Sequence, residues 1–133
     1  MIRTIQRRLI IPRGDTGSFS IPLQDTVSSG DVAVFSIFDS LTRTTVHNIN
    51  IPLTGEEEVI TIPFIREDTI NLMPKKYLWD LRIYHEPQFD NDGNLTGGSE
   101  INSYYSAFSL PVCEIREVAE DVPRTQENTR SAT

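Results

Sequence analysis

Residues 76–86 read KYLWDLRIYHE, and the alternation in this stretch decides the fold. Large apolar or aromatic side chains occupy every second position: Tyr77, Trp79, Leu81 and Ile83. Successive side chains of a β-strand point to opposite faces, so this pattern predicts a strand with one face buried in a core. The intervening positions, which include Asp80 and Arg82, belong to the other face.

Further stretches of the chain show the same period of two. They are residues 4–12, 18–23, 31–39, 44–53, 57–64 and 101–112. Gly, Pro, Asn, Asp and Ser residues separate these stretches, and no apolar stripe with the helical period extends beyond about two turns. Short strands at such spacing predict an all-β sandwich or barrel.

One segment, REDTINLMPKKY at residues 66–77, breaks the alternation. Asp68 or Thr69 is expected to cap a short helical turn near residues 67–73, and Pro74 is expected to end it. A helical turn before a strand that begins with tyrosine is typical of one corner of immunoglobulin-like sandwiches.

Tyr77 is the candidate for this corner, in which the tyrosine hydroxyl bonds back to the preceding loop. The sequence therefore predicts an immunoglobulin-like antiparallel β-sandwich of about seven to eight strands. Its expected core consists of Phe35, Ile37, Ile60, Ile62, Tyr77, Trp79, Leu81 and Phe108.

The composition is that of a single soluble domain. The chain has 133 residues, of which 38% are hydrophobic and 23% charged, and one core can hold such a length together. We expect one domain over residues 1–119. Residues 120–133 are polar and without periodicity, which predicts a flexible or partner-ordered tail.

The cysteine content and the absence of a recognisable signal peptide indicate the cellular compartment in which the chain folds. The single cysteine, Cys113, excludes an intramolecular disulfide, and its apolar neighbours favour a buried structural thiol over a catalytic one. No apolar run approaches the roughly 20 residues that span a bilayer, and no signal peptide is recognisable. We expect folding in a reducing cytoplasm and no membrane partner.

Charge is unevenly distributed along the chain. The net charge of −7 argues against general affinity for nucleic acid. However, Arg3, Arg7, Arg8 and Arg13 all precede the first acidic residue, Asp15. A basic N-terminal strand could dock onto an acidic neighbour, although a solvated strand face is the favoured interpretation.

The sequence offers no catalytic or cofactor motif, so we expect neither an enzyme nor a cofactor. A weak calcium candidate is DNDGN at residues 90–94, in which Asp90, Asp92 and Asn94 alternate as in an EF-hand. The glycine precedes Asn94 instead of following it, and the twelfth position is Ile101 rather than glutamate. A hairpin turn is therefore favoured over a metal site.

Residues 87–98 form a long connection between two predicted strands. Most hairpin loops have about two to five residues, and longer ones are often functional. The segment is interpreted equally well as a ligand or subunit contact and as a longer twisted hairpin around Asp92-Gly93.

Arg13-Gly14-Asp15 spells the tripeptide that integrins recognise. Integrin ligands are secreted, whereas Gly-Asp is ordinary turn chemistry. Gly14 and Gly17 can adopt left-handed angles, and Asp15 can accept a backbone hydrogen bond from two residues on. A turn between the first two strands is favoured over cell attachment.

The stretches RGDTGSFSI (13–21), GDVAVFSIFD (30–39), EDTINLMPKKYLWDLRIY (67–84) and DNDGNLTGG (90–98) follow one another in order. Together they resemble a family of small tail or baseplate proteins from phages and prophages of Gram-positive gut bacteria. They are also similar, more distantly, to the N-terminal β-sandwich domain of siphophage baseplate upper proteins. The likeness covers residues 10–118 and departs from the family at Lys75 and Lys76, where a glycine is common.

The resemblance implies a non-enzymatic virion protein that docks onto other phage structural proteins or onto its own copies. It would be assembled in the bacterial cytoplasm. The candidate interaction residues are the basic Arg3, Arg7 and Arg8 and the aromatic Tyr84, Phe89, Tyr104 and Tyr105. The alternative is a carbohydrate-binding or host-surface adhesion module, in which the aromatic residues would hold a glycan.

Overall fold

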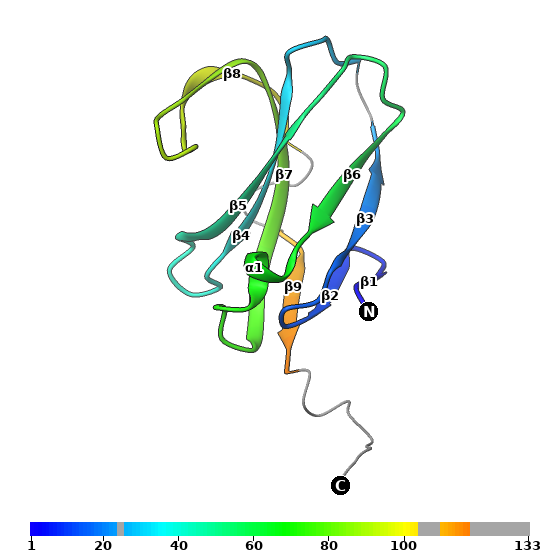
Figure 1. Cartoon of the computed structure of the whole chain (residues 1–133), viewed down its shortest axis with the longest axis vertical. Helices are drawn as coiled ribbons and strands as arrows, with labels where there is room; N and C mark the ends of the chain where they lie inside the picture. The colour runs from blue at the N-terminus through cyan, green and yellow to red at the C-terminus, as the bar shows by residue number, and fades with distance from the viewer. Residues whose placement is uncertain (24–25, 104–109, 118–133) are drawn as a thin grey trace, which may run out of the picture.

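A computed structural model describes residues 1–23, 26–103 and 110–117 (Figure 1). The strands are β1 (Arg3–Ile5), β2 (Arg8–Pro12), β3 (Gly17–Pro22), β4 (Val32–Phe38), β5 (Thr45–Pro52), β6 (Val59–Phe64), β7 (Lys75–Phe89), β8 (Leu95–Ser103) and β9 (Val112–Arg116). One short helix, α1 (Arg66–Thr69), lies between β6 and β7. Tyr104, Tyr105, Phe108 and the predicted tail at 120–133 lie outside the described residues.

The strands form two sheets. The larger has the order β1-β2-β9-β7-β4-β5, and β8 pairs with the part of β7 beyond β9. The smaller is the antiparallel pair β3-β6. Lettered as in immunoglobulin domains, β3 and β6 take the places of strands B and E, and β4, β7 and β9 those of C, F and G. The predicted all-β, sandwich-like fold is confirmed.

An aromatic cluster joins the sheets. Phe19 of β3 and Phe64 of β6 pack against Phe35 of β4, with ring centroids 5.7 and 5.5 Å from it. Trp79 of β7 lies 5.6 Å from Phe35 and 5.7 Å from Phe19. Every described member of the predicted core is buried.

The predicted tyrosine corner is present at the start of β7. Tyr77 is 3% exposed, and its hydroxyl donates a hydrogen bond of 2.7 Å to the Met73 carbonyl. Burial raises the pKa of the Tyr77 phenol, so the hydroxyl stays protonated and remains a donor. Lys75 places its ammonium group 5.0 Å from the Tyr77 ring centroid.

The predicted capping of the helical turn is wrong in detail. Ile65 is the N-cap of α1, and Asp68 lies inside the helix, where its carboxylate accepts the Ile65 N–H at 2.8 Å. Thr69 is buried as the last helical residue, and its hydroxyl accepts the Gly14 N–H. The helix thus ends several residues before Pro74.

The first predicted strand, residues 4–12, is two strands. Gln6 has a φ angle of +57°, which breaks the extended backbone and folds β1 onto β2 as a hairpin. Ile5, an apolar residue in this stretch, is 54% exposed. The alternation did not reveal this turn, because a turn without glycine or proline cannot be recognised from residue composition.

The Arg13-Gly14-Asp15 turn is confirmed as a turn, but it joins β2 to β3, the second and third strands. The Asp15 N–H donates to the Pro12 carbonyl at 3.0 Å, and Gly14 has a φ angle of +80°. Gly17 also has a positive φ, +153°. The Asp15 carboxylate does not bond to the backbone as expected, and lies 3.0 Å from the Met1 amine.

Candidate functional site

Strand β5 is one edge of the larger sheet and pairs only with β4 among the described strands. Its sequence, TVHNINIP, contains no Lys, Arg, Asp or Glu. Ile49 and Ile51 pack against the core, whereas Asn48 and Asn50 face solvent. A register shift opposite Ile37 and Phe38 leaves Val46 39% exposed.

A histidine–carboxylate hydrogen bond and an ion pair fix the end of the sandwich where β5 begins. His47 Nε2 lies 2.8 Å from Asp68 Oδ1, which ties β5 to α1. The Lys75 ammonium lies 2.8 Å from Asp39 Oδ2, which ties the β4–β5 turn to β7. This hydrogen bond, together with the N–H groups of Thr42 and Leu41, holds the pKa of the Asp39 carboxyl well below its usual range.

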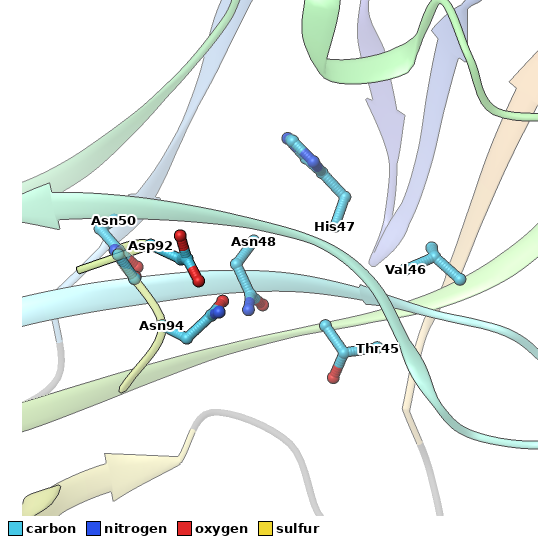
Figure 2. A pocket seen from close by; sticks show the side chains of 8 residues that line it. Thr45, Val46, His47, Asn48, Asn50, Asp92 and Asn94 are labelled. Atoms are coloured by element: carbon cyan, nitrogen blue, oxygen red, sulfur yellow. The ribbon is translucent and has the colours of Figure 1, made fainter. Parts of the chain in front are cut away.

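A polar groove of about 510 Å³ lies between β5 and the tip of the β7–β8 hairpin (Figure 2). Six side chains define it: Thr45, Val46, Asn48, Asn50, Asp92 and Asn94. The Asn50 amide donates to the Gly93 carbonyl at 3.1 Å and so joins the strand to the hairpin. His47 also borders the groove but points to the other side of β5, toward its Asp68 partner (Figure 2).

The hairpin reaches β5 because β7 is strongly irregular beyond Ile83. Its pairing with β8 shifts register three times, and Glu86 has a φ angle of +49°. Gly98 lets the two strands approach closely, since a Cβ there would lie 2.8 Å from the Pro87 Cα. Residues 87–98 have the geometry of the longer twisted hairpin, which was one of their two interpretations.

The weak calcium candidate is a hairpin turn in this structure. Asp90 Oδ1 accepts the N–H groups of Asp92 and Asn94, both at 2.9 Å, so this oxygen is engaged with the backbone. The Asp92 and Asn94 side chains point into the groove instead (Figure 2). Within the described ranges, no three His, Cys, Asp or Glu side chains gather as a metal site.

The basic N-terminal residues are partly neutralised within the chain. Arg8 pairs with Glu114 of β9, and Arg13 pairs with Glu117 at 3.0 Å. Arg3 and Arg7 are exposed. The N-terminal strands therefore carry less free charge than their sequence indicates, because the parallel β2–β9 pairing brings acidic residues alongside them.

The two aromatic candidates that the structure describes, Tyr84 and Phe89, lie outside the groove. Tyr84 is partly buried in β7, opposite Val32 of β4. Phe89 ends β7 opposite Leu95 and is 37% exposed. Neither side chain lines the groove. The groove residues of β5 escaped the sequence analysis because amides in an alternating strand look like an ordinary solvated face.

A histidine–carboxylate pair sits at the opposite end of the sandwich from α1. His85 Nδ1 lies 2.8 Å from Asp31 Oδ1, and Asp31 is 1% exposed. This hydrogen bond raises the pKa of His85, and Glu86 adds to the effect.

We expect this pair to make stability depend on pH. A histidine whose pKa is raised on folding stabilises the folded state at pH values below its unfolded pKa of about 6.5. This stabilisation is lost as the pH rises through its folded pKa. The urea midpoint of the parent, relative to that of His85→Gln, should therefore fall as the pH rises above about 6.5. Equal pH profiles for the two proteins would contradict the pairing.

Cys113 should be chemically inert in the folded protein. The thiol is fully buried in β9, and burial raises its pKa to about 12. Because the thiolate is the reactive form, we expect no reaction with Ellman's reagent at about pH 8 until the protein is unfolded in urea. Rapid reaction without denaturant would show that the β2–β9 interface opens.

No family model matches this chain, and neither a curated protein nor a solved structure matches it. In the part of the chain that the structure describes, no helix is long and apolar enough to cross a membrane.

Proposed function

We propose that this chain is a non-enzymatic structural protein of a bacteriophage, a tail or baseplate component that acts by docking onto other proteins. The phage setting is supported by the resemblance of four stretches that follow in order across residues 10–118. The docking is supported by the geometry of β5.

The observation that carries the docking proposal is the uncharged edge of β5. Exposed edge strands present unpaired N–H and C=O groups, and proteins usually blunt them with lysines, prolines or bulges. In β5 the register shift at Val46 and Pro52 stand at the two ends, which leaves residues 47–51 between them. An extended segment of a neighbouring subunit could add to the sheet along this stretch.

Exposed apolar side chains flank the same edge. Val46 is on β5 itself, and Leu41, 89% exposed, is in the turn that leads into it. Ile65 and Met73, 58% and 70% exposed, lie on either side of α1. The His47–Asp68 hydrogen bond and the Lys75–Asp39 ion pair connect these segments, so the surface is held in place without a partner.

The phage assignment is tested by the protein content of purified particles. Particles banded in a density gradient should contain the chain at a constant ratio to the major tail protein, as measured by quantitative mass spectrometry. A chain that is abundant in the lysate but missing from the particles would contradict a virion role.

A further inference from the structure

The groove between β5 and the β7–β8 turn has the chemistry of a binding site for a neutral, hydroxyl-rich molecule. Its size of about 510 Å³ falls within the roughly 300–1,000 Å³ of small-molecule sites. We propose that it binds a saccharide. This inference rests on the groove alone and does not depend on the phage assignment.

The side chains of the groove offer both donors and acceptors. Asn48 uses its Oδ1 to accept the Ser36 hydroxyl at 2.6 Å, which directs the amide group and leaves its NH₂ as a donor. Among the described residues, the Asp92 carboxylate and the Asn94 amide have no hydrogen-bond partner. Adjacent hydroxyls of a sugar both donate and accept, so they match a carboxylate beside amides.

The charge of the groove selects against other ligand classes. Among the residues that the structure describes, Asp92 is the single carboxylate that lines it, and no Lys or Arg does. The Asp92 carboxylate would repel an anion that has no cationic side chain to pair with, and a divalent cation would find one carboxylate where calcium sites usually have several. Within the described part of the chain, Val46 is the one apolar residue in the lining, so a wholly apolar ligand would find little complementary surface.

The groove is also organised before any ligand arrives. The Asp90 carboxylate fixes the backbone at both Asp92 and Asn94, and the Asn50 amide fixes Gly93 to β5. Ligand binding then orders few additional groups, which favours affinity.

The test is a glycan array of bacterial and animal saccharides probed with the full chain, followed by ¹H–¹⁵N NMR titration. The titration uses N-acetylglucosamine, galactose and the strongest monosaccharide from the array. We expect shifts confined to residues 45–50 and 92–94. Asp92→Ala should weaken binding about tenfold or more, since it removes a charged hydrogen-bond acceptor.

Asn91→Ala is the matched control, because Asn91 is exposed on the same turn but does not line the groove. Asn48→Ala is a second variant, and it should weaken binding in the same direction as Asp92→Ala. Shifts elsewhere, equal affinities of Asp92→Ala and Asn91→Ala, or no binding by any sugar would each overturn the proposal. So would tighter binding of Ca²⁺ or inorganic phosphate in the same groove.

Discussion

Replacing Trp79 with alanine should lower the free energy of unfolding by about 3–5 kcal/mol, the cost of emptying a large aromatic site in a core. Trp79 is 2% exposed and packs against Phe19 and Phe35 from both sheets. Its indole Nε1–H also donates to the Arg7 carbonyl at 3.1 Å, which ties the β1–β2 turn to β7. Urea unfolding of the two proteins measures the difference directly.

Two controls separate these contributions. Trp79→Phe keeps an aromatic ring in the core but removes the hydrogen bond to Arg7, so its cost should be clearly smaller. Phe89→Ala removes an aromatic side chain from the exposed end of the same strand and should change stability by only about 0.5 kcal/mol. A Trp79→Ala protein as stable as the parent would mean that the register of β7 is wrong.

Tyr77→Phe should cost about 1–2 kcal/mol, because it leaves the Met73 carbonyl without its donor. The change removes one oxygen atom and leaves the buried ring in place, so the loss reports on the corner hydrogen bond itself. Tyr84→Phe, which removes the hydroxyl of a partly exposed tyrosine on the same strand, is the matched control. Equal stabilities of the two variants would contradict a tyrosine corner in this protein.

The corner and the core could be predicted because they depend on local patterns. Alternation over residues 76–86 places Tyr77 and Trp79 on one face, and a helical turn before that tyrosine indicates the immunoglobulin-like connection. Both features lie within about 20 residues of each other in the chain, and neither requires knowledge of which strands pair.

The candidate site could not be predicted because it depends on pairing and irregularity. Asn48 and Asp92 meet only because β7 bends beyond Ile83 and carries its hairpin back to β5. The exposure of Val46 likewise follows from a register shift between β4 and β5. Bulges of this kind leave little trace in residue composition, since they depend on the partner strand as much as on the bulged one.

Four arginines before Asp15 allow two interpretations when the sequence is considered alone, a docking strand and the favoured solvated strand face. The parallel pairing of β2 with β9 places Glu114 and Glu117 beside Arg8 and Arg13, so part of that charge stabilises the chain's own ends. The uncharged β5 edge is therefore the better candidate for docking.

The most direct test of docking through β5 compares Val46→Lys with Val59→Lys in purified particles. Val46 and Val59 are 39% and 46% exposed, but Val59 lies on the other sheet. A lysine on an edge strand disfavours strand addition, so quantitative mass spectrometry should find Val46→Lys depleted from particles about tenfold or more, the equivalent of about 1.4 kcal/mol, and Val59→Lys retained. Equal incorporation of the two folded variants would contradict docking through this edge.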